Sequence, residues 1–269
     1  MALNMIVCVK QVPDPEAPAS AFKVDEAAKK VVTAAGVAPV ISQFDAIAVE
    51  AALRIKDAMG DGKITVISMG PASARDVIKH GLAMGADEGV LLSDPAFEDG
   101  DSYTTALVLT TAISKLGSPD IVFCGRQATD WDMGVTGTAI AEMLGVPSAT
   151  FAKDVQHRDG KLIVERALPD GFETVEMSLP CLVTVSNEMG EPRYPKLQQI
   201  MTAARKQVAT WSAADLGLSS DQVGAAGVRL ALERLFQPVQ ETQCEFVDGE
   251  TPEESAQKLA QRLREAKII

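Results

Sequence analysis

Four short apolar runs in the first half of the chain constrain its fold more than any other feature. They are Met5–Val9, Ile64–Met69, Gly89–Leu92 and Asp120–Cys124. Each run has the length of one strand and offers apolar side chains to both faces, which is typical of a parallel sheet covered by helices on both sides. The sequence therefore predicts an α/β fold whose central sheet contains these four strands.

The stretches between these runs have helical periodicity. Apolar residues recur on one helical face from Phe44 to Met59, and Ser42 with Asp45 resembles a capping box before them. Two further helices are predicted at 77–84 and at about Ser102 to Leu116. The resulting order, βαβαβαβ, predicts a doubly wound α/β layer.

The pattern changes near residue 150. Lys161–Leu168 and Phe172–Met177 alternate as strands do and are separated by a Pro-Asp-Gly turn, and Leu182–Val185 is one more strand. Residues 190–206 contain Pro, Arg and Lys, and we expect an exposed loop there. This part predicts a β-rich segment added to the α/β layer.

The tail has the pattern of a helix joined to the core by a weakly periodic segment. Thr251 and Pro252 form a helix start, and Ala256, Leu259 and Leu263 follow at helical spacing. We therefore expect two parts, an α/β domain at 1–215 and a C-terminal arm at 216–269 that packs on a partner chain.

Composition excludes several classes of function. Lys plus Arg number 25 and Asp plus Glu number 37, and the net charge of −12 disfavours a nucleic-acid partner. No stretch approaches the about 18 consecutive apolar residues of a membrane span. Four well-separated cysteines and the absence of a secretory signal pattern favour reduced thiols. We expect a soluble cytoplasmic protein without a metal site.

Catalytic motifs are missing from the sequence. It contains no GxSxG, HExxH, Walker phosphate loop or GxGxxG, and neither His80 nor His157 stands beside a candidate nucleophile. Catalysis by acid–base or nucleophilic side chains is therefore not indicated.

The segment Gly125–Gly137 is the strongest candidate for a binding site. It follows the fourth predicted strand and precedes a predicted helix, and ligands of open α/β sheets bind at the carboxyl ends of strands. Gly134, Thr136 and Gly137 would let backbone N–H groups approach a phosphate at the helix N-terminus. Asp130 and Asp132 suit ribose hydroxyls or an adenine amine instead. A helix that simply follows a turn would give the same pattern.

Several motifs together resemble the β-subunit of electron transfer flavoproteins. Val9–Asp14 (VKQVPD), Gly81–Asp87 (GLAMGAD), the segment Gly125–Gly137 and Glu191–Tyr194 (EPRY) occur in that family's order. The similarity runs from residue 5 to about 206, and residues 250–269 resemble the family's C-terminal helix.

This resemblance implies a heterodimer that carries electrons. In such proteins the α-subunit holds most of the FAD that exchanges electrons with dehydrogenases, and the β-subunit buries an adenine nucleotide in a flavodoxin-like domain. The flavin supplies the redox chemistry, and the protein binds and orients it. The implied fold is a flavodoxin-like doubly wound parallel sheet with an added β-rich segment and a C-terminal helical arm.

The resemblance also assigns residues to the nucleotide pocket. They are Cys8, Val9, Ser42, Gln43, Phe44, Asp45, Met69, Gly125, Arg126, Gln127, Ala128, Thr129, Asp130, Trp131, Asp132, Met133, Gly134, Val135, Thr136 and Gly137. Trp131 replaces the Asp or Gly that is usual in the family, so it either stacks on a base or blocks it.

The nucleotide itself is AMP in ordinary members and a second FAD in electron-bifurcating members. Lys10–Asp14 resembles the nitrogen-fixation and bifurcating branches, whereas Thr136 matches the AMP-binding loop. We favour AMP and keep FAD as the alternative. Two other classes stay open, a universal-stress-type ATP-binding protein, which does not explain residues 160–206, and a flavodoxin-like enzyme with FMN alone.

A second implied site binds the partner dehydrogenase. The segment from Glu191 through Arg205 resembles the one that anchors acyl-CoA dehydrogenases, which assigns partner binding to Arg193, Tyr194 and Leu197. An exposed Leu197 would enter an apolar pocket on the partner. A loop that closes on its own domain is the alternative.

Overall fold

A computed structural model describes residues 2–238 and 243–269 of the chain. These residues form two compact units, one made of the residues up to Lys23 with Val31–Glu233, and one made of Val24–Lys30 with Arg234–Ile269. Residues 239–242, inside the expected arm 216–269, and Met1 lie outside the described residues.

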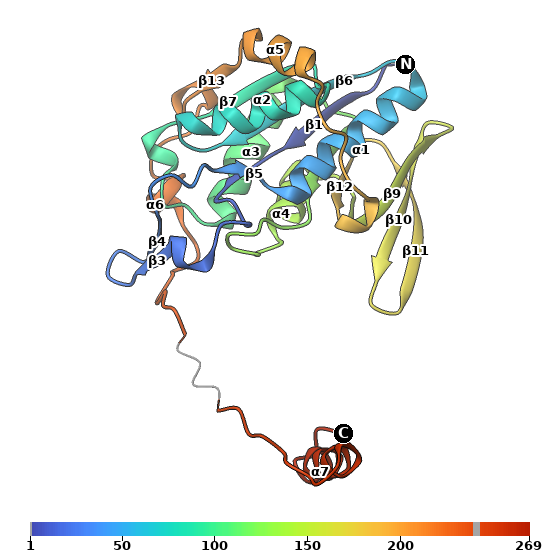
Figure 1. Cartoon of the computed structure of the whole chain (residues 1–269). Coiled ribbons are helices and arrows are strands. Elements are labelled where there is room, and N and C mark those ends of the chain that lie inside the picture. Colours follow the sequence, from blue (N-terminus) through green and yellow to red (C-terminus); the bar gives the residue numbers. More distant parts are fainter. Residues whose placement is uncertain (1, 239–242) are drawn as a thin grey trace. The chain divides into compact units, whose positions relative to one another are not determined.

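The first unit is built on a nine-stranded sheet, in the order β11-β10-β9-β12-β8-β1-β6-β7-β13 (Figure 1). The four predicted strands form its parallel centre and are β1 (Asn4–Cys8), β6 (Lys63–Met69), β7 (Glu88–Leu92) and β8 (Ile121–Gly125). The predicted α/β class is therefore confirmed.

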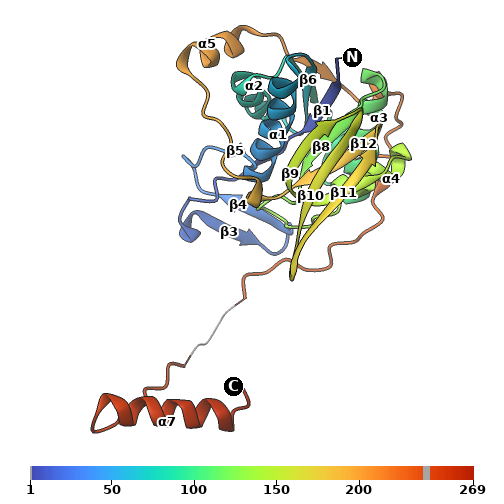
Figure 2. The same cartoon turned by 90° about the vertical axis from the view of Figure 1, so that its right-hand side faces the viewer.

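The remaining strands extend or flank this centre. The sheet continues through β12 (Cys181–Val185), β9 (Ser148–Arg158), β10 (Lys161–Leu168) and β11 (Gly171–Ser178) on one side and β13 (Ala209–Trp211) on the other. Figure 2 shows β8, β12, β9, β10 and β11 side by side. Separate two-stranded sheets pair β2 (Gln11–Val12) with β5 (Val40–Ile41) and β3 (Phe22–Asp25) with β4 (Lys30–Thr33). Of the β-rich segment, the sequence pattern predicts three strands and misses β9.

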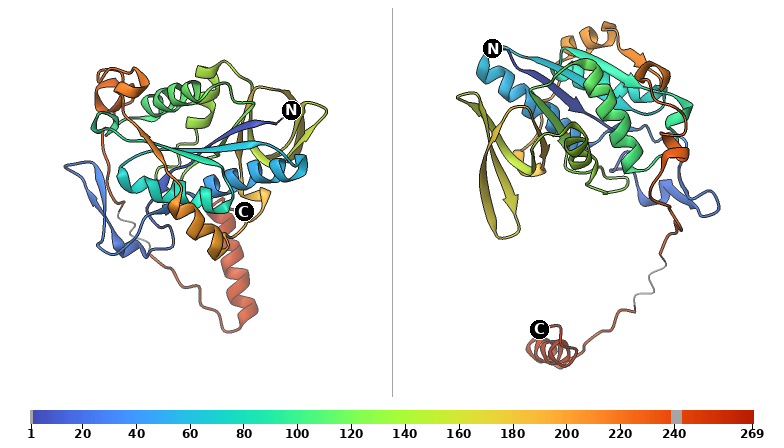
Figure 3. Two further views of the ribbon diagram at one scale, coloured as in Figure 1. Left: turned by 90° about the horizontal axis from the view of Figure 1, so that it is seen from above. Right: turned by 180° about the vertical axis from the view of Figure 1, so that it is seen from behind.

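Helices cover both faces of the sheet because side chains alternate along each strand. Met5 and Val7 pack with α1 (Gln43–Met59) and α2 (Arg75–Met84), whereas Ile6 and Cys8 pack with α3 (Ser102–Leu116) and α4 (Thr136–Leu144). Figure 3 shows α3 and α4, in green, on the face opposite α1 and α2. Short 3₁₀ turns are η1 (Ala19–Ala21), η2 (Ala72–Ala74), η3 (Pro95–Phe97), η4 (Asn187–Met189) and η5 (Ala214–Leu216).

The expected exposed loop at 190–206 is wrong over half its length. Leu197–Arg205 forms the helix α5, which packs on α2 through the buried Ala203. The Lys79 ammonium on α2 holds the C-terminal end of α5 by donating hydrogen bonds to the backbone oxygens of Ala203 and Lys206. Leu197, Ile200, Met201 and Ala204 do stand at helical spacing, but the prolines and basic residues of 190–206 favour a loop.

The chain after residue 216 divides between the two units. The short helix α6 (Gly224–Gly227) belongs to the first unit, where the Ala225 N–H donates to the Glu98 oxygen at 2.9 Å. In the second unit, α7 (Pro252–Glu265) starts as predicted, because the Thr251 hydroxyl accepts the Glu254 N–H. None of the side chains of α7 is buried.

The described residues were predicted to lack a membrane span and a metal site. Across 2–238 and 243–269, helices are too short or too polar to cross a membrane. The same residues bring together no group of three or more His, Cys, Asp or Glu side chains that could hold a metal ion.

Candidate functional site

The segments assigned to the pocket meet at the carboxyl edge of the sheet. The parallel strands β1, β6 and β8 end there with Cys8, Met69 and Gly125. Helix α1 starts beside these strand ends, and α4 starts after the loop that leaves β8. The structure thus gathers residues that lie more than a hundred positions apart in the sequence.

The Asp45 carboxylate joins three of these segments. Its Oδ2 accepts the Lys10 N–H at 2.8 Å, and its Oδ1 accepts the Gly125 N–H at 3.0 Å. Ser42 is the residue that precedes α1, as predicted, but its side chain makes no capping bond. The predicted capping box is therefore wrong, because Asp45 turns to the strand ends rather than to the helix start.

Two ionisable or polar groups here are buried. Burial raises the pKa of Asp45 to about 7, against the lowering effect of the Lys10 and Gly125 N–H groups and the Lys10 charge. The Ser42 hydroxyl lies close to this carboxylate, yet its Oγ is fully buried and makes no hydrogen bond with any residue that the structure describes. A buried polar atom without a partner is rare in folded proteins, and the Asp45 carboxylate is the group whose pKa this hydroxyl lowers.

Glycines allow the close approach of helices to the strand ends. A Cβ at Gly125 would lie 2.4 Å from Asp45 Oδ1, and a Cβ at Gly137 would lie 2.7 Å from Thr184 Cγ2. Gly137 therefore allows α4 to pack closely on the sheet. Gly134, with φ of +65°, takes a left-handed conformation that other residues rarely adopt.

The N-terminus of α4 is open. The first N–H groups of a helix, here those of Thr136, Gly137 and Thr138, lack an intrahelical partner, and within the described chain the preceding Val135 gives them no side-chain cap. The Thr138 hydroxyl donates to the Val135 oxygen at 2.9 Å, whereas the Thr136 hydroxyl has no partner among the described residues. The helix dipole favours an anion at this end.

Charges in the loop before α4 are balanced. Lys10 Nζ lies 2.6 Å from Asp130 Oδ2, and Asp132 Oδ1 accepts a hydrogen bond from Gln127 Nε2 at 3.0 Å. The Lys10–Asp130 ion pair removes much of the repulsion that Asp130 would exert on a phosphate.

The other assigned residues differ in exposure. Cys8 and Val9 are buried, whereas Phe44, Met69, Arg126, Gln127, Ala128 and Thr136 are half-buried and Gln43, Thr129, Trp131, Asp132, Met133 and Val135 are exposed. The N–H groups of Val9 and Arg126 donate to Ile67 and Val185 at 2.8 and 2.9 Å. The N–H groups of Lys10 and Gly125 donate to Asp45. All four of these N–H groups are therefore already hydrogen-bonded within the protein and are not available to a ligand.

Sequence reasoning did not predict that Phe151 lies beside this edge. The Arg126 guanidinium lies 5.2 Å from the ring centres of both Phe44 and Phe151, and Nη1 donates to Ser186 Oγ at 3.2 Å. Phe151 takes a φ of +58° at an irregularity in the pairing of β9 with β12. A bulky residue in this conformation is unusual, and no sequence signal predicts it.

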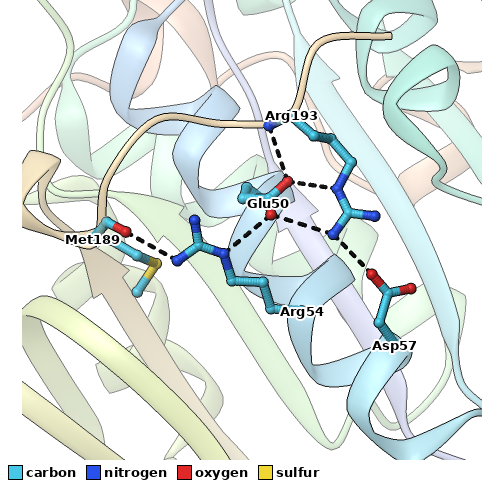
Figure 4. Close-up of polar contacts among 5 residues, drawn as sticks. All are labelled: Glu50, Arg54, Asp57, Met189 and Arg193. Atoms are coloured by element: carbon cyan, nitrogen blue, oxygen red, sulfur yellow. Dashed lines mark hydrogen bonds and ion pairs between the residues drawn. The ribbon is translucent and has the colours of Figure 1, made fainter. Parts of the chain in front are cut away.

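The segment assigned to partner binding is anchored by a buried carboxylate on α1 (Figure 4). Glu50 accepts the Arg193 N–H at 3.1 Å and its Nε at 2.7 Å, and Arg54 Nε donates to it at 3.0 Å. Arg54 also donates to the Met189 oxygen at 2.9 Å. Burial raises the pKa of Glu50, but the bonds from Arg193 and Arg54 outweigh it and hold the pKa below its ordinary value.

The three assigned partner residues consequently lie in different surroundings. Arg193 faces its own domain, where its Nη2 also lies 2.8 Å from Asp57. Tyr194 and Leu197 point outwards, with 89% and 75% of their surfaces exposed. Exposed apolar side chains continue along α5 at Ile200 and Met201.

Known proteins place this chain in one family. Residues 29–216 match the model of the electron transfer flavoprotein domain. The electron transfer flavoprotein subunit beta of Thermoanaerobacterium thermosaccharolyticum is 40% identical over 99% of this chain and 100% of its own length. The caffeyl-CoA reductase-Etf complex subunit CarD of Acetobacterium woodii is 37% identical over 99% and 100%, and the protein FixA of Azorhizobium caulinodans 36% identical over 88% and 85%.

An α/β layer with an open helix N-terminus at its carboxyl edge defines a class of nucleotide-binding folds. Within that class, the chain belongs to the electron transfer flavoprotein β-subunit family. The carboxyl edge fits the phosphate of a nucleotide, because the N-terminus of α4 has no side-chain cap among the described residues.

Proposed function

We propose that the chain is the β-subunit of a heterodimeric electron transfer flavoprotein in the cytoplasm. It shuttles electrons between a dehydrogenase of the acyl-CoA dehydrogenase type and a downstream acceptor. FAD, held mostly by the α-subunit, supplies the redox chemistry, and this chain binds AMP as a structural group. The observation that carries the proposal is the open α4 N-terminus over the strand ends, in a chain of this family.

The residues of the carboxyl edge have separate roles in this proposal. The Thr136 hydroxyl and the first N–H groups of α4 hold the phosphate, and Ser42 supplies a further hydroxyl. Asp132 is an acceptor for ribose hydroxyls, and the exposed indole of Trp131 is available to stack on the base. No side chain in this set transfers electrons itself.

A second FAD in the same place is the alternative, in which the complex bifurcates electrons from NADH. One observation favours it. A relative with 37% identity over nearly the full length is named as a subunit of a caffeyl-CoA reductase-Etf complex, so the partner of this chain is a reductase rather than an ordinary dehydrogenase in that case.

The dehydrogenase is proposed to dock on Tyr194 and Leu197. Both side chains are exposed, and the ion pairs of Arg193 hold the segment that carries them in one place. A rigid surface loses less entropy on binding than a flexible loop does.

Substitution of Thr136 by Val tests the nucleotide site. The variant loses the free hydroxyl but keeps its shape, so the affinity of the nucleotide-free complex should fall about tenfold or more, as for a lost hydrogen bond to a charged group. Thr138→Val is the matched control, because the Thr138 hydroxyl bonds within its own turn. Calorimetry with AMP and FAD in turn measures both affinities. Equal affinities for Thr136→Val and the wild type would contradict the proposed phosphate position.

A further inference from the structure

We propose that Asp45 is a positioning residue of the nucleotide site, and that nucleotide affinity depends on the ionisation of its carboxylate. The inference rests on the proposed function, because it concerns the same site. It assigns to Asp45 a role other than direct contact with the nucleotide.

Both oxygens of the Asp45 carboxylate are committed to the backbone. Oδ2 takes the N–H that follows β1, at Lys10, and Oδ1 takes the N–H of Gly125 at the end of β8. An ionised carboxylate accepts strong hydrogen bonds at both oxygens, whereas a protonated one carries a hydroxyl at one oxygen, which is a weaker acceptor. Protonation of Asp45 therefore weakens the hydrogen bond to one of the two strand ends.

Lys10 connects Asp45 to the loop before α4. Its N–H donates to Asp45, its backbone oxygen accepts the Ser42 N–H at 2.9 Å, and its ammonium pairs with Asp130 at 2.6 Å. Gly125, the other partner of Asp45, is where the same loop leaves β8. Asp45 thus fixes one end of the loop directly, and it fixes Asp130 through Lys10.

Gly125 allows the Asp45 carboxylate to approach the end of β8. A Cβ at Gly125 would lie 2.4 Å from Asp45 Oδ1 and 3.0 Å from the Asp45 nitrogen. The backbone of Gly125 does not take a left-handed φ, so the glycine is required by the approach of the carboxylate and not by the turn itself.

The groups around Asp45 act on its pKa in opposite directions. Burial raises its pKa to about 7, and the Lys10 charge favours the ionised form. The Cys8 thiol and burial raise the pKa of Cys124, so this neighbour stays neutral near pH 7. The Lys10 ammonium is thus the positive charge that acts on Asp45. With its pKa raised to about 7, Asp45 changes its ionisation near neutral pH.

Proton release on nucleotide binding tests the inference. If the ionised carboxylate shapes the site, binding must in turn favour ionisation, because the coupling is reciprocal. Calorimetry of the nucleotide-free αβ complex at pH 7, in buffers of different ionisation enthalpy, measures the protons released on binding AMP or FAD. The wild type should release more than Asp45→Asn with the same nucleotide, and the variant should bind about tenfold more weakly.

Asp101→Asn is the matched control. Asp101 also accepts backbone N–H groups from two segments, Thr104 and residues 229–230, but it lies at the start of α3. The Asp101→Asn substitution should lower the stability of the fold without changing the nucleotide affinity or the proton release. Equal proton release by the wild type and Asp45→Asn would overturn the inference and leave the proposed function standing, whereas a wild-type complex that binds neither nucleotide would overturn both.

Should Asp45→Asn fail to fold, the wild type itself gives a second measurement. In complex labelled with ¹³C-aspartate, the carboxyl resonance of Asp45 should titrate near neutral pH and move to a lower midpoint when nucleotide is bound. A midpoint that nucleotide leaves unchanged would overturn the inference.

Discussion

Glu50 is 5% exposed and accepts hydrogen bonds from two arginines, of which Arg193 lies 143 positions further along the chain. Removing one charge from a buried ion pair is costly because the remaining charges lose their partner. Here both arginines are more than a third exposed and solvent screens them. We therefore expect Glu50→Gln to lower the free energy of unfolding by about 2 kcal/mol, less than for a fully buried pair.

The effect of this substitution depends on pH. The pKa of Glu50 is lower in the folded chain than its ordinary value of 4.5. Its ion pairs thus contribute their full stability above pH 4.5 and lose it as the pH falls through the folded pKa. Urea unfolding from pH 3 to 8 should show the wild type and Glu50→Gln converging at the acid end. Asp57→Asn, at an exposed partner of Arg193, is the control with a loss of about 0.5 kcal/mol. A constant difference at every pH would contradict the role given to Glu50.

Residues such as these explain why the site was only partly predictable. The glycines and threonines of 125–137 form a local pattern that the sequence displays. By contrast, Asp45 looks like a capping residue by its spacing, and its real partners, Lys10 and Gly125, are 35 and 80 positions away. Glu50 and Arg193 have the same limitation, since nothing in their local sequence specifies the pairing.

At the scale of elements, the strands of the parallel centre are predictable because they are apolar on both faces. β9 is not, because its exposure is mixed along eleven residues and its pairing with β12 includes an irregularity. Helix α5 is not predicted because Pro192 and Pro195 before it and the basic residues around it favour a loop. Its place depends on contacts with α2 that are distant in sequence.

The outer face of α5 gives a prediction at this scale. Leu197→Ala should weaken binding of the dehydrogenase by about 2 kcal/mol and leave the bound nucleotide unchanged, because truncating a side chain that fills a pocket on the partner costs about this much. Gln198→Ala, one position along the same exposed helix, is the matched control. Steady-state electron transfer at varied dehydrogenase concentration measures the effect. Wild-type kinetics for Leu197→Ala would mean that Leu197 does not reach the partner.

For the whole molecule, the two units predict where the chain can be shortened. The sequence pattern predicts an arm from residue 216, but Val223 is fully buried and α6 bonds to Glu98. Deletion of 234–269 should therefore leave the thermal midpoint of the first unit unchanged and abolish the heterodimer. Deletion of 224–269 should lower that midpoint, because it removes contacts of the first unit. An intact heterodimer on gel filtration after the shorter deletion would contradict the role of the C-terminal part.

The central claim is that this chain holds an adenine nucleotide beside the flavin of its partner. The direct measurement is mass spectrometry of the nucleotides released from the denatured, purified αβ complex, with their amounts per heterodimer. We predict one AMP and one FAD. Two FAD molecules and no AMP would show that the site holds the second FAD of the alternative proposal. One FAD with no further adenine nucleotide would contradict the nucleotide site altogether.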